Sequence, residues 1–283
     1  MAIVDKGPRA RAAAAARYAV LAAGALLFVL PFYLLLRNAL MTEAQITAPR
    51  WHFVPPTWEW GNLRTLFTDP AVPMARSLLN SIAISVTQTV GVLVVSGLAG
   101  YGLARIPYRW SNAVFLAVTG SLLIPAAVTF VPSFVLVSTL GWVSTLRGLI
   151  IPGLFQALAT FLFRQFYLGF PKEIEEAAFI DGLGYWGTFW RIVVPNSYGF
   201  AAAIGTITFI GSWNAFLWPL VIAQDQEAWT VQIALSTFLT AQSVNLAELF
   251  MAALVAILPL LLMFLFLQRW IVEGVERTGI GGD

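Results

Sequence analysis

The chain has 283 residues, of which 59% are hydrophobic and 11% are charged, whereas a soluble domain has about 25% charged residues. This balance excludes a soluble globular protein and indicates a chain that lies in a membrane. The net charge of +2 comes from scattered basic residues, which argues against a nucleic-acid partner. The chain has no cysteine, which excludes disulfides and thiolate metal sites. We expect no metal at the single histidine, His52, and interpret it as an ordinary surface residue.

Long apolar stretches account for this composition. A transmembrane helix needs about 20 mostly apolar residues. The chain has six stretches of roughly that length or more without Asp, Glu, Lys or Arg, namely 18–36, 77–104, 111–146, 148–163, 192–224 and 249–268. We therefore predict an all-α integral membrane protein with six transmembrane helices.

The lysines and arginines predict how these helices are oriented. With the N-terminus in the cytoplasm, the cytoplasmic segments hold eleven of the 16 Lys and Arg residues and the external segments hold five. This excess on the inside follows the positive-inside rule, and the opposite orientation would reverse it. We therefore expect both termini in the cytoplasm, with an uncleaved first helix rather than a signal peptide.

In chain order, the spans divide the protein into four regions. Residues 1–17 form a basic cytoplasmic tail, 18–74 the first transmembrane helix and a proline-rich external loop, 75–268 a core of five helices, and 269–283 a second cytoplasmic tail. A cytoplasmic loop over 171–195 interrupts this core between the fourth and fifth of the six predicted spans.

Three features of the core give expectations about its helices. Pro125 predicts a kink in the third span, because proline removes a helical hydrogen bond, and a loop is expected from about Pro132. The fifth span is expected to be one helix over about 197–222. Small residues near the end of the second span favour close helix packing: Ser96, Gly97, Gly100 and Gly102.

The loop from Pro171 to Pro195 is unusually acidic for this chain. Pro171 suits the first position of a helix, three glutamates favour its first turns, and Gly182 suits a left-handed helix end. A second short helix is expected over about 185–194. Such a unit can dock into a soluble partner through its carboxylates or lie at the membrane interface, and the residue pattern leaves both interpretations open.

The stretch EAAFIDGLGYWGTFWRIVVP in this loop resembles the EAA motif of binding-protein-dependent ABC importers. The motif residues stand at the family's spacing, with valine at 194 where leucine is usual: Glu176, Ala177, Ala178, Gly182, Ile192 and Pro195. GSWNAFLWPL, over 211–220, resembles the fifth-span stretch of carbohydrate-importer permeases. The likeness covers most of the chain and is to the smaller, maltose-transporter-type permease, a family that also serves glycerol-3-phosphate.

The resemblance implies a type I ABC importer permease fold in the cytoplasmic (inner) membrane of a bacterium or archaeon. It implies a heteromeric complex with a second permease, two ATP-binding subunits and an external substrate-binding protein, all among membrane lipids. It also implies that the motif residues, together with Asp181, contact the ATPase, with Glu176 facing an arginine there. Glu173 and Glu175 stay unassigned, as solvated neighbours.

The chain is not expected to be an enzyme. Its two lysines, Lys6 and Lys172, do not belong to a P-loop motif, so ATP cannot be bound in the P-loop manner. We therefore expect no cofactor on this chain, with ATP and Mg held by the partner ATPase subunits.

Polar residues expected at membrane depth are candidates for the substrate path, because unpaired polar groups in lipid are costly. The alternative is that they form hydrogen bonds between helices. The candidates are Ser85, Gln88, Gln156, Trp213 and Asn214.

The resemblance favours import of a sugar, either a mono- or oligosaccharide or a derivative. A non-sugar solute, such as glycerol-3-phosphate, an amino acid or a peptide, stays open as an alternative. A secondary transporter is disfavoured because it would place ionisable residues inside the spans. An intramembrane enzyme is disfavoured because the chain has no His or Cys constellation.

Overall fold

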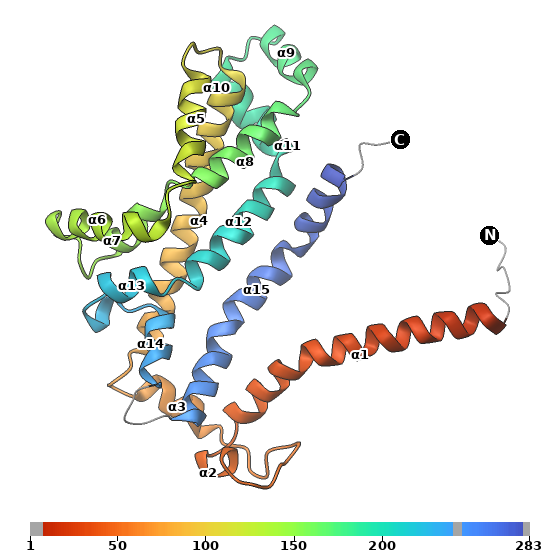
Figure 1. Cartoon of the computed structure of the whole chain (residues 1–283), viewed down its shortest axis with the longest axis vertical. Helices are drawn as coiled ribbons and strands as arrows, with labels where there is room; N and C mark the ends of the chain where they lie inside the picture. The colour runs from red at the N-terminus through yellow and green to blue at the C-terminus, as the bar shows by residue number, and fades with distance from the viewer. Residues whose placement is uncertain (1–7, 240–244, 280–283) are drawn as a thin grey trace. The chain divides into compact units, whose positions relative to one another are not determined.

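The computed structural model of the chain describes residues 8–239 and 245–279. Within these residues every regular element is a helix, and Figure 1 labels the α-helices. The prediction of an all-α chain is therefore confirmed.

The first of two compact units comprises Met1–Asp69 and Phe238–Val255. Its longest helix, α1 (Pro8–Ala39), contains the first predicted span and begins before it. The proline-rich loop that follows holds two short helices, α2 (Glu43–Ile46) and α3 (Gly61–Thr68). Prolines around these helices prevent a longer regular element, as expected.

Hydrogen bonds tie this first unit together. The side-chain Nδ2 of Asn62 donates to the carbonyls of Ala39 and Met41, both at 2.9 Å. The backbone N–H of Ala247, at the start of α15 (Leu246–Gly279), donates to the Glu43 carboxylate at 3.1 Å. The end of α1 and the beginning of α15 are thus held by the short helices of the loop.

The second unit comprises Pro70–Thr237 and Ala256–Asp283. Its central helix is α4 (Met74–Arg105), against which α8 (Ala157–Leu168) and α12 (Tyr198–Trp213) pack along their lengths (Figure 1). The polar residues described below lie on or beside these three helices.

Small residues on α4 allow the close packing that the sequence predicts. A Cβ added at Gly100 would lie 2.7 Å from the Cβ of Phe163 and 2.9 Å from the backbone N of Arg164, so α8 approaches closer than an alanine would allow. Gly97 is also buried, whereas a Cβ at Gly102 would meet nothing within 4 Å. The prediction of a packing role for Gly102 is therefore wrong.

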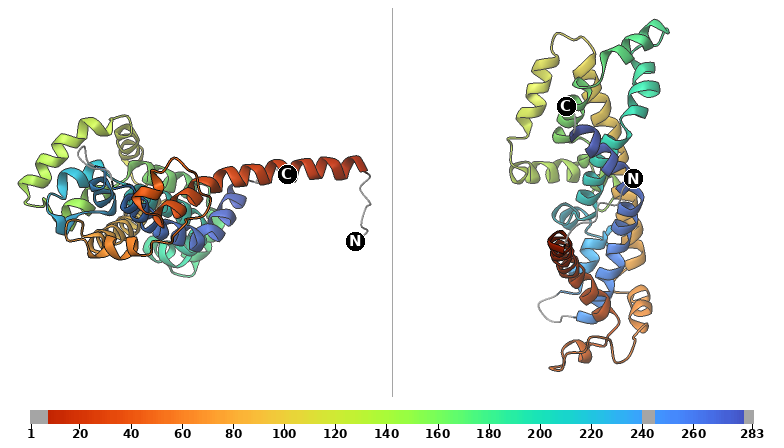
Figure 2. Two further views of the ribbon diagram at one scale, coloured as in Figure 1. Left: turned by 90° about the horizontal axis from the view of Figure 1, so that it is seen from below. Right: turned by 90° about the vertical axis from the view of Figure 1, so that its right-hand side faces the viewer.

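The third predicted span is broken rather than kinked. Its halves, α5 (Ser111–Ser121) and α6 (Ala126–Thr139), meet at 98°. The right-hand view of Figure 2 shows the sharp bend between them. Pro125 directly precedes α6 and has no N–H to continue α5. The loop predicted from Pro132 is wrong, because Pro132 lies inside α6 and the apolar sequence after it remains helical.

The fourth and fifth predicted spans are also discontinuous. The fourth consists of α7 (Leu146–Ile150) and η1 (Ile151–Gly153), which meet α8 at 42°. The prediction of one continuous fifth helix is wrong, because α12 ends and α13 (Leu217–Ile222) begins after a gap over 214–216. Pro219 is compatible with this break, because it lies in the first turn of α13, where a missing N–H is tolerated.

After α13, a short polar return packs against the beginning of α4. It contains η3 (Gln226–Ala228) and α14 (Val231–Thr237). Nδ2 of Asn80 on α4 donates to the carbonyls of Glu227 and Trp229, at 2.8 and 2.9 Å. These bonds hold the return against α4, whereas the hydroxyl of Ser77 at the same end of the helix is buried without a partner among the described residues.

Between α8 and α12 lies the acidic segment that the sequence predicts as two short helices. The first, α9 (Lys172–Ile180), begins one residue after Pro171, not at it. In place of the second stand α10 (Tyr185–Thr188), the π-helical turn η2 (Phe189–Val193) and α11 (Val194–Asn196). Residues 172–196 are called the α9–α11 segment below.

Three helices in the described chain are each long and apolar enough to cross a membrane: Ala13–Ala39, Met74–Arg105 and Leu246–Phe266. The total is up to six if each bent pair counts as one span, the third such pair being Tyr185–Asn196 with α12 at 79°. The chain is thus a multi-pass membrane protein whose helices fit the prediction of six spans. The cytoplasmic position of both termini stays a prediction.

Candidate functional site

The end of α9 is a glycine turn of the kind that the sequence predicts. Gly182 has a φ of +82°. The N–H groups of Gly182 and Leu183 donate to the carbonyls of Phe179 and Ala178, both at 3.0 Å. This pair of bonds is a Schellman motif, which closes the helix and reverses the chain. Glycine adopts the required positive φ without steric cost.

The returning half of the α9–α11 segment is anchored in the core of the second unit. Phe189 and Val193, both on η2, are buried among the aromatic side chains of α4 and α8. The Phe189 ring lies 5.1 Å from that of Tyr101 on α4. The two halves of the segment contact each other through Phe179 and Tyr185, whose rings meet edge to face at 5.1 Å. The segment is therefore a rigid projection rather than a free loop.

The projection presents an exposed face that combines acids with large apolar side chains. Glu176, Ala177 and Asp181 are exposed, and the neighbouring Ile180 and Trp186 are 86% and 67% exposed. We call these five residues the outward face. Exposed apolar side chains beside charges are typical of a surface that another protein covers.

The remaining motif residues lie elsewhere in the segment. Ala178 is on the buried side of α9, where a larger side chain would push the helix away from the core. Ile192 is half-buried on η2, and Pro195 is exposed on α11. The predicted motif thus divides into an outward face, the Gly182 turn and residues that shape the support beneath them.

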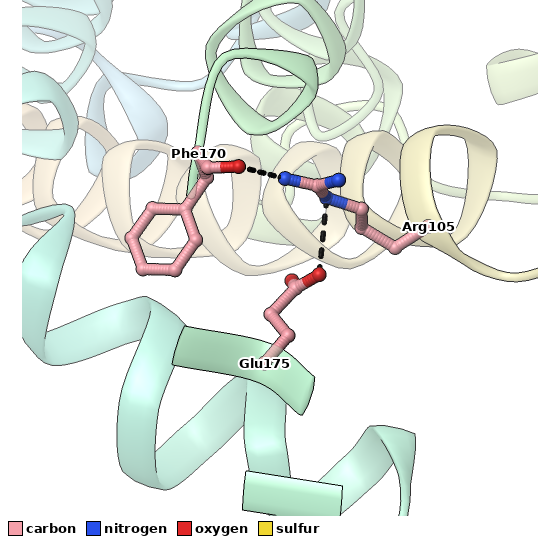
Figure 3. A network of polar contacts seen from close by, with 3 residues as sticks. All are labelled: Arg105, Phe170 and Glu175. Carbon is pink, nitrogen blue, oxygen red and sulfur yellow. Dashed lines mark hydrogen bonds and ion pairs between the residues drawn. The ribbon is translucent and has the colours of Figure 1, made fainter. Parts of the chain in front are cut away.

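A buried ion pair joins α9 to the end of α4. Nε of Arg105 lies 3.2 Å from Oε2 of Glu175, and the two side chains are 7% and 8% exposed. Arg105 also donates through Nη2 to the carbonyl of Phe170, directly before α9 (Figure 3). Burial raises the pKa of Glu175, and the Arg105 charge opposes that shift. A single arginine therefore holds both the carboxylate of α9 and the backbone that leads into it.

The solvated position expected for Glu175 is wrong, whereas Glu173 is exposed as expected. The sequence contains one indication of the pair. Arg105 is the first charged residue after the long apolar stretch of the second span, so it must lie at the membrane edge. The predicted topology places the acidic segment at that same edge. The pairing itself could not be found, because it depends on the fold.

Two of the five predicted path residues line a cavity of about 530 Å³ in the second unit, namely Gln88 and Gln156. Nε2 of Gln88 donates to the carbonyls of Leu149 and Ile150, at 2.9 and 3.2 Å. Its Oε1 accepts from the hydroxyl of Ser212 at 2.6 Å. Gln88 therefore secures the end of α7, and Ser212 is a lining residue that the sequence reasoning missed.

The other three predicted path residues lie outside this lining. Ser85 is fully buried on α4. Trp213 is also buried, and its indole Nε1 donates to the carbonyl of Ala256 at 3.2 Å. Asn214 is exposed, and its Oδ1 accepts from Gln232 at 3.3 Å. Trp213 and Asn214 thus have the interhelical role that the sequence left open as the alternative.

Apolar helices broken around a cavity, with an anchored projection between α8 and α12, are typical of a membrane transport protein. Residues 93–277 match the family described as the inner membrane component of binding-protein-dependent transport systems. The chain belongs to that family. The resemblance to ABC importer permeases drawn from the EAA spacing is confirmed.

Named relatives share most of their length with this chain. The arabinooligosaccharide transport system permease protein AraQ of Halalkalibacterium halodurans is 34% identical over 81% of this chain and 82% of its own. The sn-glycerol-3-phosphate transport system permease protein UgpE of Yersinia pestis is 30% identical over 89% of this chain and 92% of its own length.

A solved structure shows the same fold. A chain of a bacterial ABC transporter involved in the import of the acidic polysaccharide alginate superposes with a TM-score of 0.81, covering 94% of this chain and 99% of its own. Its identity to this chain is 18%. The likeness shows that the broken spans belong to an ABC importer permease fold.

Proposed function

We propose that this protein is one permease subunit of an ATP-driven importer for a sugar, either a mono- or oligosaccharide or a derivative. It acts in the cytoplasmic (inner) membrane of a bacterium or archaeon. Its partners are a second permease, two ATP-binding subunits and an external substrate-binding protein. The arabinooligosaccharide permease among its relatives supports the sugar assignment.

The observation that supports the coupling role is the outward face of the α9–α11 segment. Glu176 and Asp181 are exposed there beside Ile180 and Trp186, on a projection whose other side is buried in the bundle. A carboxylate on a rigid support is suited to pair with an arginine of a soluble partner. In this proposal Glu176 makes that contact with the ATPase, and the Gly182 turn fits the projection into its cleft.

The energy for transport then comes from the partners, which hold ATP and Mg. ATP closes the ATPase pair and moves the docked projection, and the bundle changes from inward-open to outward-open. The external protein then releases its solute into the path. ATP thus biases an equilibrium between two states of the bundle. Within this chain, Arg105 and Glu175 connect the projection to α4.

Glycerol-3-phosphate is the second candidate substrate, supported by a relative of that specificity with similar identity. An amino acid or a peptide has less support, since neither relative reported above is named for one. A neutral sugar and glycerol-3-phosphate differ in charge. The chemistry of the cavity lining therefore bears on the choice between them.

The coupling role is tested by reversing one charge on the outward face. The chain is co-expressed with the second permease and the ATP-binding subunits proposed as its partners, and the complex is reconstituted in liposomes with the external binding protein. Glu176→Arg is expected to lower ATP-dependent solute uptake at least tenfold and to reduce co-purification of the ATPase subunit. The reason is that arginine would face the partner's arginine.

Glu173→Arg is the matched control, because Glu173 is also an exposed acid of α9 but lies outside the motif. It is expected to keep both uptake and ATPase association. Full ATPase association in Glu176→Arg would contradict the coupling role. Equal losses in the two variants would indicate a general effect of charge rather than a docking contact.

A further inference from the structure

Three helix breaks meet at the cavity of the second unit. The lining includes Thr129 and Phe130 just after the α5–α6 break, Gln156 at the η1–α8 break, and Ala215 at the α12–α13 break. Non-helical backbone at membrane depth is tolerated only where protein buries it or where it lines a water-filled cavity. Discontinuous helices mark substrate sites in other membrane transporters for this reason. The convergence of breaks indicates a place built for a polar occupant.

Some polar side chains of the lining already form hydrogen bonds with the helices around the cavity. Both polar groups of Gln88 are bonded, to α7 and to Ser212. The hydroxyl of Thr129 donates to the carbonyl of Ala126 at 3.1 Å, and the indole Nε1 of Trp218 donates to that of Gly148 at 3.0 Å. These residues form the scaffold of the cavity.

Three other lining residues have unused side-chain groups. Ser133, Gln156 and Thr208 line the cavity, and their side chains make no hydrogen bond to any residue that the structure describes. Thr208 is only 5% exposed. The polar atoms of the three side chains are not among the buried side-chain atoms of the described chain that lack a partner, so they are accessible from the cavity. Two hydroxyls and one amide are therefore available to a ligand.

An aromatic pair supplies the apolar part of the wall. The rings of Phe130 and Trp218 meet edge to face at 5.8 Å, and both line the cavity. Ligand sites combine such apolar surface with a few placed polar groups. A sugar ring has the matching character, with C–H groups on its faces and hydroxyls around its edge.

None of the described residues that line the cavity is charged. A phosphate or carboxylate brought there would lose its hydration without gaining an ionic partner from this chain, and such a transfer is strongly unfavourable. Hydroxyl and amide groups can instead exchange hydrogen bonds with a neutral ligand at little electrostatic cost. The lining therefore distinguishes between the two candidate substrates.

We propose that this cavity is a subsite for a neutral saccharide in transit, with Ser133, Gln156 and Thr208 bonding its hydroxyls and Phe130 and Trp218 forming its apolar wall. The inference rests on the proposed function and refines it. It excludes phosphorylated and acidic sugars as preferred solutes of this permease.

The test uses the complete reconstituted complex with its external binding protein. Gln156→Leu is expected to lower the rate of arabinotriose uptake about three- to tenfold, the loss that corresponds to one hydrogen bond. The ATPase activity stimulated by the binding protein should stay unchanged, because the coupling segment is intact. Gln165→Leu is the matched control, the same substitution at an exposed position of α8, the helix that Gln156 directly precedes, and is expected to keep full uptake.

A second variant fills the cavity without removing a polar group. Gly211 lines it, and a Cβ there would meet nothing within 4 Å. Gly211→Leu should therefore fold, assemble and hydrolyse ATP normally, but lose uptake more than tenfold. Normal uptake in both Gln156→Leu and Gly211→Leu would overturn the subsite.

A solute panel separates the subsite from the function on which it rests. Arabinotriose, lactose, sn-glycerol-3-phosphate and trigalacturonate are offered to the wild-type complex. ATP-dependent uptake of neutral solutes alone supports the subsite. Uptake of an anionic solute in preference to the neutral ones overturns the subsite and leaves the importer function standing. Absence of uptake for every solute, together with no ATPase association, overturns both.

Discussion

Arg105 and Glu175 form a buried ion pair that joins α9 to α4. Removing two charges from water costs several kcal/mol, and a pair repays this only with good geometry and further bonds. Arg105 has such a further bond, to the carbonyl of Phe170. Oε1 of Glu175 is buried without a hydrogen-bond partner among the described residues. The pair is therefore better understood as a device that specifies where α9 sits than as a source of net stability.

Breaking the pair from one side should be costly. Arg105→Met keeps the apolar stem but leaves the Glu175 carboxylate buried and unpaired, which is expected to destabilise the fold by about 3–5 kcal/mol. The measurement is thermal denaturation of the purified complex. Combining Arg105→Glu with Glu175→Arg should recover part of the loss.

Arg109→Met provides the control for that experiment. Arg109 is an exposed arginine close in sequence that stacks on the Trp110 ring at 4.7 Å. Its loss is expected to change stability by no more than about 0.5 kcal/mol, as for most surface positions. A stability of Arg105→Met equal to that of Arg109→Met would show that the buried pair does not hold α9.

At the scale of helices, the contact of α4 with α8 depends on one missing Cβ. Gly100→Ala would place a carbon 2.7 Å from Phe163 and 2.9 Å from the Arg164 backbone. Backbone cannot yield as a flexible side chain does, so we expect a loss of about 1–3 kcal/mol from overpacking. Gly102→Ala, where the added carbon meets nothing within 4 Å, should be neutral or slightly stabilising. Equal melting temperatures of the two variants would contradict this account of the packing.

The cap of α9 gives a second prediction at this scale. Gly182→Ala introduces a Cβ at a φ of +82°, which costs about 1–2 kcal/mol in the left-handed region. No neighbouring atom lies within 4 Å of that Cβ, so the loss comes from backbone strain and not from a clash. Gly184→Ala is the control, because Gly184 has a φ of −83°. Thermal denaturation of both variants, with ATPase association as a second readout, distinguishes strain at the turn from loss of any glycine.

Local chemistry decided which elements could be predicted. The α9–α11 segment follows from its glycine, its acids and its motif spacing, all within a few residues of one another. The breaks at 122–125, 154–156 and 214–216 could not be placed, because apolar composition continues across them and a proline in an apolar stretch is compatible with either a kink or a break. Pro125 ends one helix, whereas Pro132 lies inside the next. The difference depends on neighbouring helices and not on the residue.

In the second unit, α4 connects the α9–α11 segment to the cavity. Its end carries Arg105, which holds α9, and its middle carries Gln88, which holds α7 and Ser212 at the cavity. Tyr101, between them, packs on Phe189 of η2. We expect a displacement of the α9–α11 segment to reach the cavity through this helix, since the side chains of Arg105 and Tyr101 are buried at their contacts and Gln88 is bonded on two sides. Gln88 and Gln156 were predictable as polar residues at membrane depth, but their different roles required the hydrogen bonds.

The orientation of the whole molecule can be tested directly because the chain contains no cysteine. Tyr108→Cys lies in the loop after α4, which the positive-inside rule places in the cytoplasm, and Trp58→Cys lies in the predicted external loop. Both positions are exposed, so labelling reports sidedness rather than burial. A membrane-impermeant maleimide applied to spheroplasts should modify Trp58→Cys at once and Tyr108→Cys only after permeabilisation. The reverse pattern would place the α9–α11 segment outside the cell, where it could not meet an ATPase, and the coupling role would fall with the topology.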